Sequence, residues 1–298
     1  MSRHERGAPM KGVRTAIAAV AVVTVGVSTP GAAQQGSESG GDESAVRYDV
    51  TSDVLADPGQ VTFDLSVSVQ NGTDLNDQPQ QLPNTSITQV QPGFRTLYSV
   101  TSALDLEMQI SGNHTVNQVL ASSTGPGRSV SDSRFATVAA GLRYLFVEEG
   151  AYPALQGFFS INFVEDAIDD TVFVKSGNVG VRFRKSVDPV VIRTSLTYVR
   201  RGERNRQGAS FDPADSWASE TSLDFFINDK FALTGEIGLE VFENDEFAGQ
   251  DLERQRIGIP LQGGVRYTVS QDILLSLSGE VDTTRDSTRF DVGLQYIM

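Results

Sequence analysis

The chain of 298 residues carries 24 Lys and Arg against 38 Asp and Glu, a net charge of −14. This balance argues against nucleic acid as a partner, because phosphate binding needs a basic surface. The chain has no Cys, which excludes disulfides, thiolate metal sites and a Cys nucleophile. Beyond the first 33 residues no segment has the apolar length of a spanning helix, although the alternating strands of a membrane barrel need none.

The N-terminus has the three parts of a secretory signal peptide. Arg3, Arg6, Lys11 and Arg14 are followed by the apolar run Thr15–Val27, and then by Pro30 and the small residues 31–33. The apolar run is too short for a membrane anchor, which needs about 20 residues. We therefore expect residues 1–33 to be a leader that is cleaved after Ala33, so that the protein is exported.

Residues 34–58 form the next segment, whose first part is rich in Gly, Ser, Glu and Asp. Such a composition buries no core. We expect a flexible periplasmic lead-in, with a plug of the bore or a short helix over Val46–Leu55 as the alternatives.

From residue 59 to the C-terminus the apolar residues recur with period two, which is typical of strands. Val61, Phe63 and Leu65, for example, alternate with Thr62, Asp64 and Ser66. Twelve segments of this kind are expected: Val61–Gln70, Phe94–Thr101, Leu104–Asn113, Ser133–Phe146, Ala154–Phe163, Val172–Arg184, Val190–Arg200, Trp217–Ile227, Phe231–Phe242, Arg256–Val269, Ile273–Asp282 and Phe290–Met298.

The connections between these segments alternate between long and short. The long, polar ones are Asn71–Gly93, His114–Asp132, Glu165–Thr171, Arg201–Ser216, Glu243–Gln255 and Thr283–Thr288. Long outer loops, short periplasmic turns and an even number of strands are the layout of an outer-membrane barrel, whereas a Greek-key sandwich has no reason to alternate loop length. The sequence therefore predicts an all-β fold over residues 59–298, a transmembrane antiparallel up-and-down β-barrel of about 12 strands in the outer membrane of a Gram-negative bacterium.

Aromatic residues give a second indication, because they gather at the two membrane–water boundaries of a barrel. Those expected at the short-turn ends are Tyr144, Phe146, Phe183, Phe231, Tyr267 and Tyr296, and those expected at the long-loop ends are Phe94, Phe163, Tyr198, Trp217 and Phe290. The chain ends on a strand, with Tyr296 before the terminal Met298, a placement similar to the C-terminal signal that the barrel-assembly machinery reads. That signal usually ends in Phe or Trp, so Met298 departs from it.

Two stretches resemble outer-membrane transporters of the meta-pathway phenol-degradation family. They are PGFRTLYSVTSALDLEMQI (Pro92–Ile110) and SRFATVAAGLRYLFVEEGAYPALQGFFSINF (Ser133–Phe163). Residues 141–144 (Gly-Leu-Arg-Tyr) and 153–155 (Pro-Ala-Leu) match the family's most regular segments, while its usual Pro-Thr-Gly is replaced here by residues 164–166. The resemblance covers about 200 residues and implies a barrel of this size that passes small molecules. The phenol in the family's name says nothing about the solute of this chain.

Strand parity places charged side chains on the lumen side. The basic ones are Arg95, Arg143, Arg182, Arg184, Arg193, Arg256 and Arg266, and the acidic ones are Asp64, Asp105, Glu107, Asp224, Glu236, Glu240, Glu280 and Asp291. Arg182, Arg184 and Arg193 form a candidate basic ladder, and Asp224, Glu236 and Glu240 a candidate acidic one. These ladders either create a field that orients polar solutes or pair with each other and fill the bore. A bore of twelve strands lies between a filled eight-stranded barrel and an open porin.

Catalytic and metal constellations are not found in the sequence, so we expect no enzyme and no cofactor. His114 is the only His after the leader, at the edge of a long loop, and Ser111 falls on the opposite strand face, although a general base must reach its nucleophile. Acidic residues 243–246 and the pair Asp169 and Asp170 are more typical of solvated loops than of Ca²⁺ sites. The basic cluster 200–206 is placed to contact the sugar phosphates of lipopolysaccharide.

Two functions remain open at this level. The first is a channel or transporter for passive passage of small solutes, hydrophobic and aromatic ones included. The second is a structural or export-accessory barrel whose lumen is plugged. Outer-membrane lipid, lipopolysaccharide and the barrel-assembly machinery are the expected partners besides a solute, while the sequence is silent on the oligomeric state.

Overall fold

A computed structural model describes residues 57–72, 85–119, 128–166, 171–206, 208–252, 257–284 and 287–298. These residues belong to the second of two compact units, Val46–Met298. The predicted leader, most of the 34–58 segment and Arg256 lie outside them. Among these residues no helix is long and apolar enough to cross a membrane.

Twelve long strands make one antiparallel sheet in which each strand pairs with its neighbours in chain order. They are β1 (Val61–Gly72), β2 (Thr85–Thr101), β3 (Leu104–Val119), β4 (Arg128–Val147), β5 (Ala154–Asp166), β6 (Thr171–Val187), β7 (Val190–Arg200), β10 (Ser216–Phe226), β11 (Phe231–Phe242), β15 (Pro260–Ser270), β16 (Ile273–Asp282) and β17 (Ser287–Ile297). The two-residue segment β14 (Ile257–Gly258) precedes β15 and pairs with β11.

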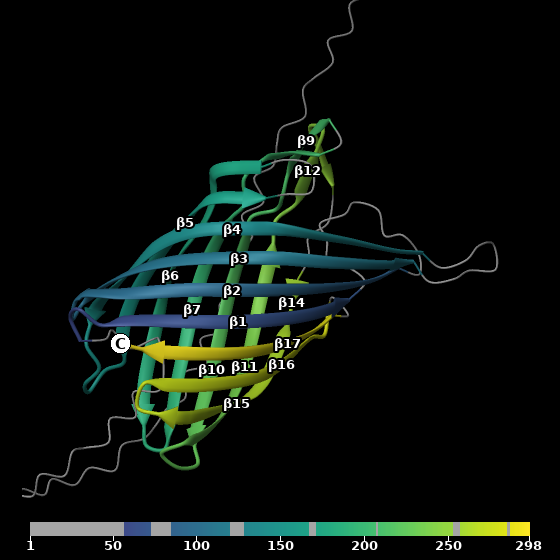
Figure 1. Cartoon of the computed structure of the whole chain (residues 1–298). Helices are drawn as coiled ribbons and strands as arrows, with labels where there is room; N and C mark the ends of the chain where they lie inside the picture. The colour runs from purple at the N-terminus through teal and green to yellow at the C-terminus, as the bar shows by residue number, and fades with distance from the viewer. Residues whose placement is uncertain are drawn as a thin grey trace, which may run out of the picture. The chain divides into compact units, whose positions relative to one another are not determined.

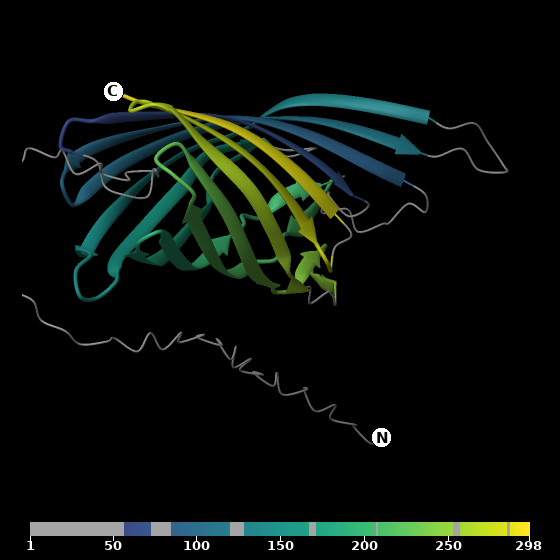
Figure 2. The same cartoon turned by 90° about the horizontal axis from the view of Figure 1, so that it is seen from below.

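The sheet closes on itself where the first strand meets the last (Figure 1). β1 pairs with β17 from Thr62 to Gly72, and the backbone N–H and C=O of Val61 bond those of Met298 at 2.9 and 2.8 Å. Figure 2 shows the purple first strand beside the yellow last one from below. With β10 also paired to β11, no strand of the ring has an open edge along its central part. The predicted closed barrel is confirmed.

The two faces of the sheet differ in polarity. The outward side chains are apolar, as at Leu65, Val67 and Val292, and are exposed on the surface. The inward ones are polar and largely buried, as at Thr62 and Ser68 of the same strand β1. This distribution is the reverse of a soluble protein and is that of a barrel whose exterior meets hydrocarbon.

Three strands are much longer than the sequence pattern indicated. β2 begins at Thr85 instead of Phe94, β3 extends to Val119 instead of Asn113, and β4 begins at Arg128 instead of Ser133. Within the predicted loops 71–93 and 114–132, all the residues that the structure describes (71–72, 85–93, 114–119 and 128–132) are therefore strand. Half of the added residues are Ser, Thr, Asn or Gln, and the added segments pair in register with each other. Apolar alternation is required only where a strand meets lipid. In these three strands the alternation ends before the backbone hydrogen bonds to the neighbouring strands do.

Two of the remaining long connections also carry strands. The connection from β7 to β10 holds β8 (Arg204–Arg206) and β9 (Ala209–Asp212), and that from β11 to β15 holds β12 (Asp245–Phe247) and β13 (Gln250–Leu252). β9 pairs with β12, so the two hairpins form one four-stranded sheet in the order β13-β12-β9-β8, which we call the loop sheet. It lies beyond the long-loop ends of β10 and β11 (Figure 1).

Outward aromatic side chains occupy both ends of the strands. Trp217 and Tyr198 pair near the long-loop end, with ring centroids 4.9 Å apart, and Phe231 and Tyr267 pair at the short-turn end, 4.7 Å apart. Phe94 is an exception to the predicted girdle. Because β2 begins at Thr85, this ring lies within the strand, opposite Leu65.

The lipid-facing position of Val292, in the middle of β17 between Val67 and Leu277, generates a prediction. Val292→Arg is expected to lower the free energy of unfolding by about 2–4 kcal/mol, the cost of Arg at the bilayer midplane of a barrel. The measurement is urea unfolding in lipid vesicles, followed by the electrophoretic shift of the folded form. Val292→Leu is the control, and equal stability of the two variants would contradict the outward placement.

Candidate functional site: the charged lumen

The charged side chains that face the lumen are concentrated around Asp224 of β10. Its side chain is only 1% exposed and accepts a hydrogen bond from Arg193 of the neighbouring β7. Arg266 of β15 reaches past β11 to the same carboxylate oxygen, at 2.9 Å from Nη1. One carboxylate thus holds two arginines from different strands. Beside this triad lies a cavity of about 150 Å³, whose wall includes Glu236 and Gln262.

Further ion pairs link neighbouring strands along the same inner wall. Arg95 of β2 binds Asp64 of β1 through Nη2 at 2.5 Å, and Arg143 of β4 binds Glu107 of β3 at 2.8 Å. Asp105 lies opposite Arg143 in the ladder and is buried. These pairs join strands that are adjacent in the sheet, so each crosses one hydrogen-bonded ladder. Their effect is to neutralise inward charges locally.

The predicted basic ladder is brought together, although its members have different partners. Arg184 and Arg193 lie opposite each other on β6 and β7, and Arg182 lies opposite Ser195. Arg184 is 3.6 Å from Glu149 in the β4–β5 turn, whereas Arg193 binds Asp224. The sequence left open whether the ladders create a field that orients solutes or pair with each other. The ion pair between Arg193 and Asp224 favours pairing.

Arg182 has an aromatic neighbour in the lumen. Its guanidinium carbon lies 5.5 Å from the ring centroid of Phe158 on β5, within the range of a cation–π contact. The ring covers Gly180, its cross-strand partner, where a Cβ would collide with the ring edge. A glycine is therefore needed at this position for the aromatic side chain to lie flat against the inner wall.

The predicted acidic ladder is divided among separate partners. Asp224 belongs to the arginine triad, and Glu240 lies 3.6 Å from Arg201. Glu236 is level with Gln262 of β15, which in turn is level with Glu280 of β16. Glu280 lies opposite Arg289 of β17. The three predicted members lie on the β10–β11 hairpin as expected, but each has different neighbours, and the row of acidic side chains continues from Glu236 to Glu280 of β16.

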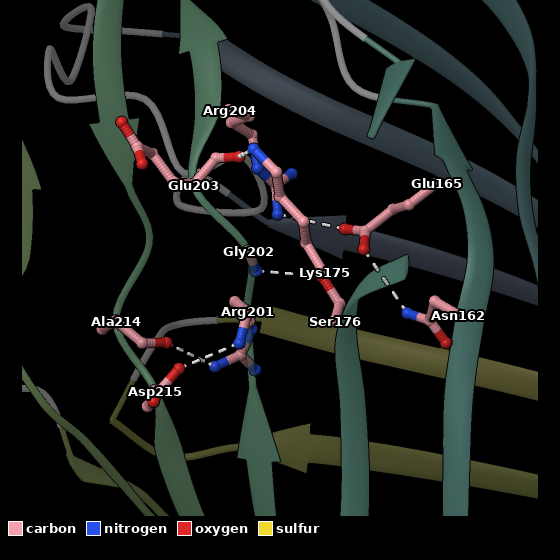
Figure 3. A network of polar contacts seen from close by, with 10 residues as sticks. All are labelled: Asn162, Glu165, Lys175, Ser176, Arg201, Gly202, Glu203, Arg204, Ala214 and Asp215. Carbon is pink, nitrogen blue, oxygen red and sulfur yellow. Dashed lines mark hydrogen bonds and ion pairs between the residues drawn. The ribbon is translucent and has the colours of Figure 1, made fainter. Parts of the chain in front are cut away.

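At the long-loop end, Arg201 connects the loop sheet to the barrel wall (Figure 3). Its backbone N–H donates to Asp215 at 2.9 Å, and its Nη1 donates to the carbonyl of Ala214 at 2.8 Å. The guanidinium also lies 5.2 Å from the ring of Phe242 and 3.6 Å from the lumen-facing Glu240. These contacts hold the segment after β7 against the start of β10 and the end of β11.

A second set of contacts fixes the same segment to β5 and β6. Arg204 binds Glu165 at 3.0 Å, and the Gly202 N–H donates to the hydroxyl of Ser176 at 2.9 Å (Figure 3). Lys175 donates to the carbonyl of Glu203 at 3.1 Å. The segment that leads into the loop sheet therefore has contacts with the barrel wall from β5 to β11.

These contacts change the interpretation of two loop motifs. Arg201 and Arg204, in the cluster expected to face lipopolysaccharide, are instead engaged with protein carboxylates, while Arg200 stays exposed. In the acidic run 243–246, Asp245 is buried and accepts a hydrogen bond from the Ala214 N–H at 2.8 Å. That residue is a structural member of the loop sheet rather than a repulsive tip. Asp169 and Asp170 lie outside the described residues.

His114 lies within β3, opposite Val90 and Ser133, and not at the edge of a loop as predicted. His114 was predicted outside the strand because β3 was expected to end at Asn113, where the apolar alternation ends. Within the described ranges no three His, Cys, Asp or Glu side chains gather as a metal site would require.

Sequence reasoning missed several inward groups. Strand parity was sufficient to place Phe158, Glu220, Gln109 and Gln295 on the lumen side. The sequence analysis considered only charged side chains as lumen residues and omitted Glu220 among them, so it did not include these four. Glu149, the partner of Arg184, was assigned to a turn, where parity gives no direction. Arg201 is the clearest case without a sequence signal, because its contacts depend on how two distant hairpins pair.

The Asp224 triad generates a stability prediction. Asp224→Asn removes the negative charge to which both Arg193, whose side chain is 7% exposed, and Arg266 are bound. Removal of one partner of a buried ion pair typically costs about 3–5 kcal/mol, so we expect a loss of about 3 kcal/mol in urea unfolding in vesicles. Asp64→Asn, at the more exposed Arg95 pair, is the matched control and should cost about 1 kcal/mol. Equal losses would show that the triad is not a buried centre.

The Arg201 contacts generate a second prediction. Arg201→Ala should cost about 2 kcal/mol locally, because hydrogen bonds to a charged group contribute about 1.5–3 kcal/mol. Amide hydrogen exchange in residues 203–213 is then expected to be about 30-fold faster, while exchange in β16 stays unchanged. The exposed neighbour Arg200→Ala provides the control, and equal protection of both variants would show that Arg201 does not hold the loop sheet.

Comparisons with known proteins identify structures with a similar fold. No protein-family model matches the chain, and no curated protein matches it either. Among solved structures, an outer membrane channel from Pseudomonas putida F1 superposes with a TM-score of 0.66 at 10% identity, covering 83% of this chain and 99% of that one. The translocator domain of the autotransporter NalP from Neisseria meningitidis follows with a TM-score of 0.50 at 11% identity, covering 82% and 90%.

At these identities the likeness establishes the architecture alone. This chain has the fold of outer-membrane β-barrels, and the match over nearly the whole length of an outer membrane channel agrees with the resemblance found in the sequence.

Proposed function

We propose that the chain is an outer-membrane channel for the passive passage of small solutes, exported with a leader cleaved after Ala33. The observation that carries this proposal is the polar inner wall. Besides the cavity beside Asp224, the wall holds a second one of about 340 Å³, and the two share Arg266 and Ser276 as lining residues. A solute in these two cavities contacts hydroxyl, amide and paired charged groups.

The resemblance in sequence left hydrophobic and aromatic solutes within the expected range. The inner wall described above favours polar ones, because its apolar members are few and mostly small, such as Ala139, Val191 and Ala232. An outer membrane channel among the structural neighbours supports passage of a solute, and that support extends no further than the fold.

The second candidate, an export-accessory barrel with a plugged lumen, draws on two observations. The ion pairs occupy part of the bore, and a translocator domain is also among the structural neighbours. Residues 34–58 would be the plug. The two functions differ in whether ions cross the barrel in the presence of this segment.

Single-channel recording distinguishes them. The mature chain, residues 34–298, and a shortened chain that begins at Asp57 are refolded in detergent and added to planar lipid bilayers in KCl. We expect discrete conductance steps from both forms, with similar amplitude. Steps from the shortened form alone would support the plug, and absence of conductance and of solute uptake by liposomes from both forms would exclude the channel. Heat-denatured protein serves as the control for leakage.

A further inference from the structure

A recess in the inner wall lies where four consecutive strands carry small residues at one level. Gly93 of β2 and Gly293 of β17 both lie opposite Ser66 of β1, and Gly293 also lies opposite Ser276 of β16. A Cβ on Gly93 would come 2.7 Å from the Ser66 hydroxyl, and one on Gly293 would collide with the Ser276 hydroxyl. The hydroxyls therefore lie over the glycines, and the wall is hollowed into the 340 Å³ cavity.

Polar side chains without protein partners converge on this recess. Gln295 of β17 lines it, is only 8% exposed, and makes no side-chain hydrogen bond within the described part of the chain. The same holds, among the residues described, for Gln109 of β3 and for the hydroxyls of Ser66 and Ser276. The amide atoms of Gln295 are not among the fully buried unpartnered polar atoms of the described residues, so they are open to the recess and to a solute in it.

The arginines that line the recess are already engaged with carboxylates. Arg95 is bound to Asp64 through both Nε at 2.8 Å and Nη2 at 2.5 Å, and Arg266 is held by Asp224 at 2.9 Å. An anion would have to displace one of these carboxylates and a cation one of these arginines, or leave its own charge unpaired. The charged groups of the recess are thus engaged with each other, whereas its amides and hydroxyls are open to a neutral solute.

Amides and hydroxyls each donate and accept, so the four unpartnered groups suit a ligand that presents both kinds of group close together. Leu274 adds an apolar surface at the side of the recess, against which C–H groups can pack. A cavity of this size is at the lower limit of small-molecule sites, which run from about 300 Å³ upward.

We propose that this recess, which we call the Gln295 recess, is a binding subsite for a small uncharged polyol of about hexose size. The subsite deepens the proposed channel function by naming the solute class that the wall retains. Gln295 and Gln109 are the specificity-determining residues, and Ser66 and Ser276 complete the hydrogen-bonding surface over the glycines.

The test is ligand-observed NMR with the mature protein refolded in detergent micelles, with D-glucose as the uncharged probe and D-gluconate and D-glucosamine as charged counterparts. We expect saturable binding of D-glucose and none of the charged probes. Gln295→Leu and Gln109→Leu are each expected to weaken glucose binding at least tenfold. Gln109 is exposed to the lumen, so its substitution leaves the packing of the wall intact should Gln295→Leu fail to fold.

The matched control is Gln91→Leu, the same substitution on the lumen face of β2 outside the recess, which should bind glucose within twofold of the original chain. Equal binding by the charged probes, unsaturable binding of glucose, or equal loss in Gln91→Leu would each overturn the subsite. Conductance in KCl, recorded on the same preparations, tests the channel separately. Conductance without glucose binding refutes the subsite alone, and glucose binding without conductance refutes the channel alone.

Discussion

Backbone hydrogen bonding in hydrocarbon is the constraint on which the rest of this structure depends. An N–H or C=O that faces lipid has no water to bond, so a sheet crosses a bilayer only when its two edges meet. Here that requirement is met where β1 pairs with β17, a contact between residues more than 200 positions apart in the chain. The apolar exterior, the aromatic ends of the strands and the polar bore all follow from closure.

Closure also explains why the interior is so rich in paired charge. Polar side chains must face inward in a barrel, and a bore of twelve strands is narrow enough for strands one or two positions apart to share a carboxylate. Asp224 illustrates this geometry, because Arg193 reaches it from the next strand and Arg266 from the strand beyond β11. The recess near Gln295 is the complementary case, in which small side chains leave the wall open and the amides unmatched.

How much of this was predictable depends on whether lipid imposes a pattern. The boundaries of β11 and β16 were obtained from sequence because these strands alternate along most of their length. β2 was predicted nine residues too short, because Thr85–Gly93 pairs with its neighbours without a regular apolar alternation, and Phe94 was consequently assigned to the end of the strand. The inward direction of Arg193 and Glu236 follows from parity, but their partners do not, because parity says nothing about reach across a curved wall. The loop sheet had no signal, since β9 and β12 meet only after the barrel has brought their hairpins together.

The single Trp of the chain has a consequence for how this barrel is studied. Trp217 is on the outward face near one end of β10, 48% exposed and packed against Tyr198. Its indole fluorescence therefore reports on one depth in the bilayer, without the overlapping emission of several indoles. Lipids brominated at different carbons along the acyl chain would quench it to different degrees, so that insertion of the unlabelled protein is followed directly as a change of depth with time.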